Sequence, residues 1–231
     1  MLPSATSPET RDKTVAVLPI GSFEQHGPSL PLTTDTLIAS ELARRSAEAY
    51  GLLLLPPVAF SCSHEHGAFP GTVSITATTL VHIIEDVAED LRRSGISKLV
   101  LMNGHGGNSV LTNVVQQANS SGRKMLLYPT SYDWATARDV AGCETTNHQD
   151  MHAGEAETSI LLAVAADQVR PGWDSLDHEV DDRSLLPLVG MEGFTESGVI
   201  GRPSRASAEK GEALLDALVA GLGQPLKELL S

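Results

Sequence analysis

Short apolar runs alternate with helical patterns along this chain, and the alternation restricts the folds that it can adopt. The predicted strands are Val15–Ile20, 52–55, 98–102 and 124–128. The predicted helices are 36–50, 79–93, 109–120, 155–165 and a last segment that starts near Ser207. Strands that are joined through helices need crossover connections, which favour a parallel sheet between layers of helices. We therefore predict an α/β fold, a three-layer α/β/α sandwich with a mostly parallel central sheet.

The 231 residues could form one large α/β domain or two small ones. We predict a single domain over residues 1–231, because no repeat, low-complexity tract or linker interrupts the pattern. Residues 134–150 and 166–206 show neither period clearly and are predicted to be long loops or lids. Residues 1–12 are predicted to be flexible.

Charge and composition argue against several classes of partner. The net charge of −13, from 16 basic and 29 acidic residues without a basic run, disfavours nucleic acid and anionic membranes. The longest apolar stretch, residues 52–60, contains two prolines and is too short to cross a bilayer. Neither an apolar signal-peptide region nor a disulfide framework is visible, so we expect a cytoplasmic location.

Three clusters of potential metal ligands follow predicted strands or open a predicted helix. They are Glu24, His26 and Asp35 in SFEQHGPSLPLTTDT, His105 in NGHGGN, and His152, Glu155 and Glu157 in HAGEAETS. Open parallel sheets place their ligand sites beyond the carboxyl ends of the strands. Imidazole and carboxylate groups together suit a divalent ion such as zinc. The clusters therefore predict a metal site at that edge.

Each cluster also has a simpler interpretation. A lone EQH in a loop is usually solvated surface, and NGHGGN could be a tight turn or a loop that cradles phosphate at a helix start. NGHGGN lacks the G-x-G-x-x-G spacing and the GK[ST] ending of nucleotide-binding loops. Two alternatives stay open: a non-catalytic α/β module that binds a nucleotide or sugar phosphate, and a structural metal protein with a closed site.

The segments GSFEQHGPSLPLTTDT, NGHGGN and HAGEAETS resemble the three signature segments of the creatininase (creatinine amidohydrolase) family, in the same order and at similar separations. HGAFPGTVSI and GVIGRPSRASAEKG resemble further family segments, so the likeness covers roughly residues 15–220. The resemblance implies a metal-dependent hydrolase of non-standard amide C–N bonds: a cyclic amide, a formamide or a terminal peptide bond. It also implies a homo-oligomer, a hexamer in this family.

The resemblance further implies two divalent ions per chain, with zinc expected first and manganese, iron or magnesium compatible with the ligand types. Glu24 and His105 match ligands of one ion, His26 matches a ligand of the other, and Asp35 matches the carboxylate that bridges both. A hydroxide shared by two ions forms near neutral pH, because the ions lower the pKa of water toward about 7. This hydroxide would attack the amide carbonyl.

Two catalytic roles follow from the same resemblance. His152 matches a histidine used in proton transfer and would protonate the departing nitrogen, and Glu157 matches an acidic residue beside it. Gly107 stands where creatininase itself has a glutamate ligand of the second ion. We therefore predict that Glu157 reaches that ion instead.

The substrate pocket departs from that of creatininase. The tryptophans that enclose creatinine have no clear counterpart: His148 stands at one such position, and Trp134 is the nearest tryptophan. The candidate substrate-binding residues are His66, Trp134, His148 and the backbone at Gly106 and Gly107, where the lack of a Cβ permits close approach.

Two versions of the activity stay open. NGHGGN, the short chain and GVIGRPSRASAEKG are more similar to the family branch that cleaves the mycofactocin precursor peptide. A small-molecule amidase is the second version. Both predict a short-peptide or small-molecule amide as substrate.

Overall fold

A parallel four-stranded sheet forms the centre of the protein, whose computed structural model describes residues 3–231. The strands are β1 (Val15–Ile20), β2 (Leu53–Leu54), β3 (Lys98–Asn103) and β4 (Met125–Tyr128), in the order β2-β1-β3-β4. On β1, Ala16 lies opposite Leu53 of β2 and opposite Leu99 of β3. Every pairing is parallel, which confirms the predicted sheet.

The sheet is buried on both faces. Alternate residues of a strand point to opposite faces, and here they enter two separate apolar cores. Val17 and Val100 belong to one core, whereas Leu18 and Leu101 belong to the other. A strand between two cores needs apolar residues throughout, and this explains why β1 was recognisable as an unbroken apolar run.

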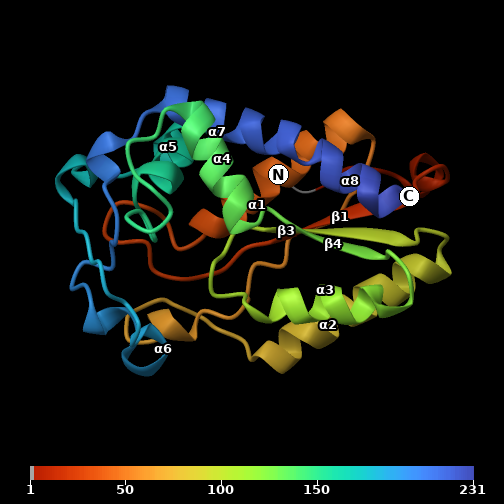
Figure 1. Ribbon diagram of the computed structural model, residues 1–231, viewed down its shortest axis with the longest axis horizontal. Coiled ribbons are helices and arrows are strands. Elements are labelled where there is room, and N and C mark those ends of the chain that lie inside the picture. The colour runs from red at the N-terminus through yellow and green to blue at the C-terminus, as the bar shows by residue number, and fades with distance from the viewer. Residues whose placement is uncertain (1–2) are drawn as a thin grey trace.

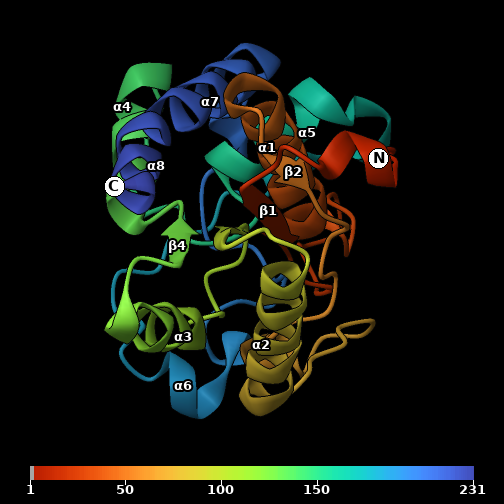
Figure 2. The same cartoon turned by 90° about the vertical axis from the view of Figure 1, so that its right-hand side faces the viewer.

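Helices cover both faces and complete three layers, as Figures 1 and 2 show. The helices of the first core are α1 (Thr34–Tyr50), α4 (Ser131–Ala141), α5 (Glu155–Val164), α7 (Ala208–Gly221) and α8 (Gly223–Leu230). The helices of the second core are α2 (Ala77–Arg93) and α3 (Val110–Ala118). The predicted α/β/α sandwich is confirmed.

One helix was missed by the sequence prediction. Residues 134–150 were predicted to be a loop, but α4 occupies 131–141. The helix starts with a reciprocal cap, in which Thr130 accepts the N–H of Asp133 and Asp133 accepts the N–H of Thr130, and it ends at Gly142 in a left-handed conformation. Its apolar periodicity is weak, because only part of one side packs against α7, so the pattern did not reveal it.

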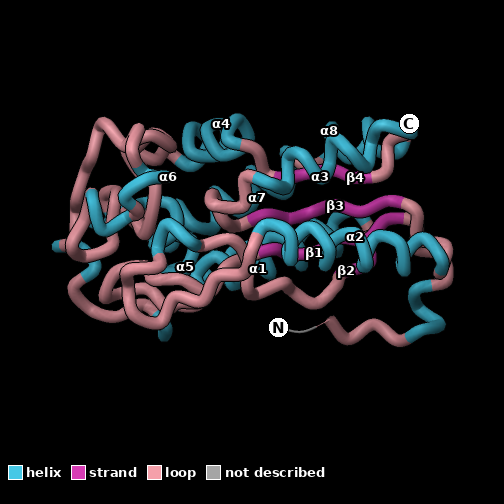
Figure 3. Tube along the Cα trace, turned by 90° about the horizontal axis from the view of Figure 1, so that it is seen from below, coloured by secondary structure: helices cyan, strands magenta, loops and turns pink. Residues whose placement is uncertain are grey.

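The last predicted helix is also two helices, since α7 ends at Gly221 and α8 begins at Gly223. Between α5 and α7 the chain forms loops, single turns and the one-turn helix α6 (Leu186–Val189), in line with the prediction for 166–206. These loops gather with α6 at one end of the sheet (Figure 3). In residues 3–231, no helix has the length and apolar character that a membrane span needs.

Candidate metal centre and active site

The loop after β1 folds back so that its acidic and imidazole groups face inward. The N–H of Glu24 donates to the carbonyl of Leu32 at 3.0 Å, and His26 pairs with Leu30 in an antiparallel bridge. Asp35 lies in the first turn of α1, which begins two residues earlier than predicted. Glu24, His26 and Asp35 are all at least 99% buried.

The NGHGGN loop after β3 brings His105 to the same place. Asn103 donates to the carbonyl of His105 at 2.7 Å, and Asn108 donates to Asn103 at 3.0 Å, so the asparagines hold the loop. A Cβ on Gly104 would lie 2.6 Å from the carbonyl oxygen of Asp35, so this position requires glycine for the close approach of β3 to α1.

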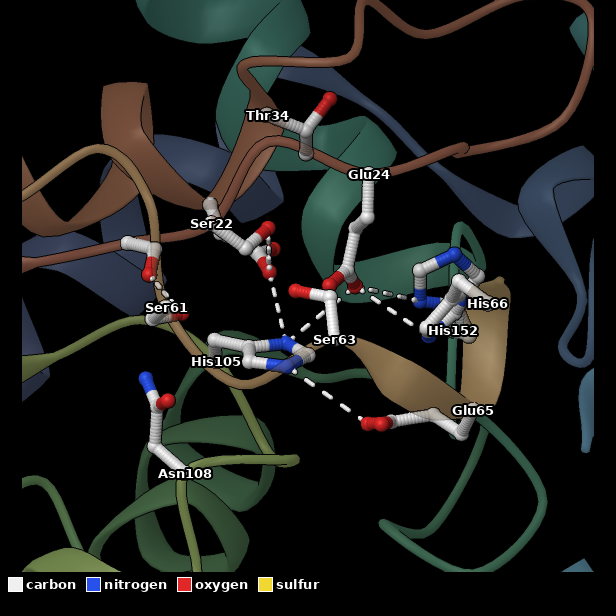
Figure 4. A network of polar contacts seen from close by, with 12 residues as sticks. Ser22, Glu24, Thr34, Ser61, Ser63, Glu65, His66, His105, Asn108 and His152 are labelled. Atoms are coloured by element: carbon white, nitrogen blue, oxygen red, sulfur yellow. Dashed lines mark hydrogen bonds and ion pairs between the residues drawn. The ribbon is translucent and has the colours of Figure 1, made fainter. Parts of the chain in front are cut away.

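Three groups of side chains at this end of the sheet have the spacing of metal ligands, with ligand atoms within 4.8 Å of one another. The groups are Glu24, Asp35 and His105; His26, Asp35 and Glu157; and Glu24, His26 and His152. Asp35 joins the first two groups: its Oδ1 lies 3.0 Å from Nε2 of His26, and its Oδ2 lies 2.9 Å from Nδ1 of His105. Figure 4 shows His105, His66 and His152 converging on Glu24.

The donor set fits a bound cation. Glu24 is fully buried, and neither of its carboxylate oxygens has a hydrogen bond of acceptable geometry from residues 3–231, although Nδ1 of His105 lies 3.2 Å from Oε1. A buried carboxylate without donors is costly, and coordination to a metal removes that cost. Imidazole nitrogens and carboxylate oxygens are ligands that zinc and manganese accept.

The charges of this cluster are interdependent. Burial disfavours the charged form of His26, but the carboxylates of Asp35, Glu157 and Glu24 outweigh burial and raise its pKa to about 9. Burial likewise opposes ionisation of His105, yet Glu24 and Asp35 raise its pKa well above the usual value. The protons on His26 and His105 supply positive charge that balances the carboxylates, as a divalent cation would.

Two further histidines have the opposite shift. Burial, together with His105 and His26, lowers the pKa of His66 to about 3. Burial, with His26 and His66, lowers the pKa of His152 well below the usual value. Both imidazoles are therefore neutral near pH 7, and they lie side by side with ring centroids 4.4 Å apart.

Gln25 fixes the tautomers of these neutral rings. Its side-chain amide donates to Nδ1 of His66 at 2.9 Å and to the carbonyl of Gly198 at 3.1 Å. Its backbone carbonyl, which can only accept, lies 2.7 Å from Nε2 of His152. His152 thus carries its proton on Nε2, and its Nδ1 is free to accept one. Gln25 stands between two predicted ligands, but no local pattern in the chain points to this role.

Glu157 lies at the mouth of the cluster. It accepts the N–H of Ala153 at 2.6 Å, and its Oε2 is 4.0 Å from Nε2 of His26. Burial and the neighbouring Asp35 outweigh the attraction of His26 and raise its pKa to about 7. Ala153 has φ of 52°, an uncommon conformation for a residue with a Cβ, at the turn that presents Glu157.

Gly107 is closely surrounded by Glu65, His105 and the backbone of Cys62. A Cβ on Gly107 would lie 2.1 Å from Oε1 of Glu65 and 2.4 Å from Nε2 of His105. Glu65 is 3.5 Å from the same Nε2, and burial raises the pKa of its carboxyl. The carboxylate of Glu65 therefore fills space beside His105 that any side chain at 107 would need.

Two adjoining cavities lead to the cluster. The first, about 360 Å³, exposes Asp35, Glu65, His66, His105, Gly106, Gly107, His152 and Glu157, with Leu186 and Pro187 of α6 on its wall. The second, about 550 Å³, is bounded by Trp134 of α4 and shares His105, Gly106, Ser109, Met151 and Glu157 with the first.

The predicted site residues are thus brought together with two exceptions, Glu155 and His148. Glu155 belongs to none of the three groups and accepts from Lys210 at 2.6 Å. His148 is exposed, lines neither cavity and faces Arg183, whose guanidinium donates to the carbonyl of His148 at 2.8 Å. Its role in substrate binding stays a prediction, as do the roles of the residues that do line the cavities. His82 is exposed on α2 and lines neither cavity.

Comparison with known proteins places the chain in a family. The family described as "Creatininase: Creatinine amidohydrolase" matches residues 4–226. The mycofactocin precursor peptide peptidase of Mycolicibacterium smegmatis is 33% identical over 223 residues, which cover 92% of this chain and 84% of that protein. A crystal structure of creatinine amidohydrolase superposes with a TM-score of 0.82 at 25% identity, over 97% of this chain and 95% of the other. A creatininase mutant of Zn–Zn type gives a TM-score of 0.78 at 27% identity, over 96% and 93% of the two chains.

Proposed function

Because this chain belongs to the creatininase family of metal-dependent amidohydrolases, we propose that it hydrolyses a non-standard amide C–N bond at a centre of two divalent ions. The observation that supports the proposal most is at Asp35: one of its oxygens lies 3.0 Å from His26, and the other lies 2.9 Å from His105. Glu24, Asp35 and His105 would hold one ion, and His26, Asp35 and Glu157 the other. Zinc is our first choice, with manganese, iron or magnesium as alternatives.

The chemistry supplied by such ions is the acidification of a water molecule and the polarisation of a carbonyl group. Hydrolysis joins the oxygen of water to the carbonyl carbon and breaks the C–N bond, and the nitrogen leaves with the electron pair and gains a proton. Nδ1 of His152 is suited to move that proton, because it is unprotonated near pH 7 and lies 3.9 Å from Oε1 of Glu24. His66, 3.2 Å from the same oxygen, would keep Glu24 in position.

The phosphate-binding module is disfavoured by the charges around the site. Among the described residues that line the two cavities, Arg138 is the single arginine or lysine, and its guanidinium already pairs with Asp150 at 2.7 Å. A phosphate group would meet carboxylates and no free basic side chain. A neutral amide suits this environment better.

Both versions of the amidase are kept as substrate proposals. The peptidase version is supported by the relatives that are named as mycofactocin precursor peptide peptidases and by a second cavity that a creatinine-sized ring would not fill. The small-molecule amidase is supported by the compact first cavity, about 360 Å³. A cytoplasmic location and a homo-oligomeric, hexameric assembly remain predictions from the sequence.

Elemental analysis of the purified protein tests the proposal directly. We expect about two divalent ions per wild-type chain and a clear loss in Asp35→Ala. Asp181→Ala, at an exposed aspartate, is the matched control. If the wild type contained one ion or none per chain, and Asp35→Ala had the same metal content, the proposal of a dinuclear hydrolase would be wrong. Hydrolysis of formamides, lactams and short peptides by the loaded protein would then distinguish the two versions.

A further inference from the structure

The first cavity contains a carboxylate to which the proposed reaction gives no role. Glu65 lies in the single turn His64–His66 and lines this cavity, with 20% of its side chain exposed. It belongs to none of the three groups that have the spacing of metal ligands. Bound ions would balance the carboxylates of those groups, but the charge of Glu65 would remain.

The fold does not complete the hydrogen bonding of this carboxylate. Within residues 3–231, the ion-pair partner of Glu65 is Nε2 of His105, which lies 3.5 Å from Oε1. That distance is too long for a good hydrogen bond, and Nε2 already donates to the carbonyl of Cys62 at 2.8 Å. Glu24 and Glu65 approach different nitrogens of the same ring (Figure 4), so the two carboxylates lie at different edges of His105.

The walls of the cavity do not supply a cation for Glu65. Among the described residues that line this cavity there is no arginine or lysine. A largely buried carboxylate that lacks donors is costly, and a ligand that donates to it removes that cost. A protonated amine suits this position, because it brings both a positive charge and three N–H donors. Leu186 and Pro187 add apolar surface for a short aliphatic chain.

Glu65 is close to the proposed metal centre. Nε2 of His105 lies 3.5 Å from Glu65, and Nδ1 of the same ring lies 2.9 Å from Oδ2 of Asp35. One imidazole ring therefore separates Glu65 from the carboxylate that the proposed function places between both ions. A small molecule whose amide reaches the centre can place a nearby amine beside Glu65.

We propose that Glu65 determines substrate specificity by binding a protonated primary amine that stands a few bonds from the scissile amide. The substrate class is then an amino amide, and a neutral amide of the same shape is a poorer ligand. The link to hydrolysis rests on the proposed function, whereas the binding of an amine to Glu65 does not require turnover.

Two ligands of nearly the same shape provide the test on the metal-loaded wild type. 3-Aminopropanamide carries a protonated aliphatic amine at pH 7, and butanamide has a methyl group in its place. Isothermal titration calorimetry gives the dissociation constant of each. We expect the amine to bind about 10-fold more tightly, the effect of one hydrogen bond between charged groups.

Variants assign this preference to one residue. Glu65→Gln keeps the shape of the side chain but removes its charge, so both ligands should bind with affinities within about twofold. Glu196→Gln, the same substitution at an exposed glutamate that lines neither cavity, is the control and should keep the preference. Elemental analysis should find wild-type metal content in both variants. Thermal unfolding identifies a variant that has lost its fold, and Glu65→Ala is the second variant if Glu65→Gln does not fold.

The outcomes separate specificity from hydrolysis. A preference for the amine that is lost in Glu65→Gln at unchanged metal content supports the proposal, whether or not either amide is hydrolysed. A preference that persists in Glu65→Gln overturns it, as does equal binding of the two ligands by the wild type. The absence of binding up to about 20 mM also overturns it. Loss of metal from Glu65→Gln overturns it as well, because Glu65 would then act by supporting His105.

Discussion

Two buried polar clusters flank the start of α5, and they are completed in different ways. The ligand cluster consists of Glu24, His26, Asp35, His105 and Glu157. The brace consists of Arg138, Asp150, Glu155 and Lys210. In the brace, Asp150 accepts from Arg138 at 2.7 Å and from two backbone N–H groups at the start of α5, and Glu155 accepts from Lys210 at 2.6 Å. In the ligand cluster, two imidazole nitrogens lie 3.2 Å from Oε1 of Glu24, but neither oxygen of Glu24 has a well-aligned hydrogen bond from residues 3–231.

The difference lies in where the cations come from. The brace contains one arginine and one lysine, so the chain itself balances its carboxylates. The ligand cluster contains imidazoles but no arginine or lysine, and its carboxylates are balanced only by protons or by an external ion. HAGEAETS supplies a carboxylate to each: Glu155 to the brace and Glu157 to the ligand cluster. Similar residues in one helical turn therefore serve stability in one case and ion binding in the other.

Removal of a carboxylate from the brace should have the largest effect on stability. Asp150→Ala leaves the buried guanidinium of Arg138 without its partner, and we expect the free energy of unfolding to fall by about 3–5 kcal/mol. Urea denaturation measures this, with Asp181→Ala as the exposed control. A loss below about 1 kcal/mol, the value of a surface pair, would remove the distinction between the two clusters.

The matched pair Glu157→Gln and Glu155→Gln sharpens the comparison. We expect Glu157→Gln to lower kcat/KM for an amide substrate by at least about 100-fold and to reduce metal content, because even an outer-shell partner of a metal is worth about 10–100-fold. Glu155→Gln should instead lower the unfolding temperature and keep its metal. If both variants lost metal equally, the separate roles of the two carboxylates would be wrong.

The pH dependence of stability should differ between the metal-free and metal-loaded protein. The pKa of His26 in the folded metal-free protein, about 9, exceeds its ordinary 6.5, so its contribution to stability is complete below pH 6.5 and is lost as the pH rises to about 9. His105 acts in the same direction. The pKa values of His66 and His152 are lowered, so these residues destabilise the folded protein only as the pH falls below 6.5. They do not affect the change expected above pH 6.5.

The free energy of unfolding of the metal-free protein, prepared with a chelator, should therefore decrease between pH 6.5 and about 9. That of the metal-loaded protein should not decrease, because metal binding favours deprotonated ligands and strengthens as the pH rises. Urea midpoints of both forms across this range make the measurement. Parallel curves would show that ions do not replace the protons of His26 and His105.

The smallest effect is expected at a histidine outside both clusters. His82→Ala, on the exposed side of α2, should leave metal content, activity and unfolding temperature within experimental error. The same three measurements as above apply. A loss of metal in this variant would mean that histidine substitutions perturb the protein in general, and the contrast between the clusters would lose its control.

The sequence predicted the parts of the molecule whose signals are local. The apolar run of β1 and the helical spacing of α2 each reflect a core that the element faces along its whole length. The ligand cluster was predictable because Glu24, His26, Asp35 and His105 follow strand ends, where a parallel sheet gathers its loops. The fold and most of the proposed ligands therefore needed no knowledge of distant contacts.

The rest depends on contacts between distant residues. The brace joins Arg138 on α4 to Asp150 and Lys210 on α7 to Glu155, and no short pattern marks these pairs. Gln25 has its role only because Gly198 and His66 lie beside it in space. His148 seemed a candidate because of its position before His152, yet the loop turns it toward Arg183 and away from both cavities.

The overlap between Glu65 and any side chain at position 107 constrains how this site can evolve. A Cβ at 107 would come within 2.1 Å of the Glu65 carboxylate, 2.4 Å of Nε2 of His105 and 2.6 Å of the carbonyl oxygen of Cys62. Loss of the Glu65 side chain alone would not make room, because the ring of His105 and the backbone at Cys62 remain. A substitution at 107 is therefore contingent on earlier changes at more than one position, including position 65, which lies 42 positions away in the chain (107 minus 65).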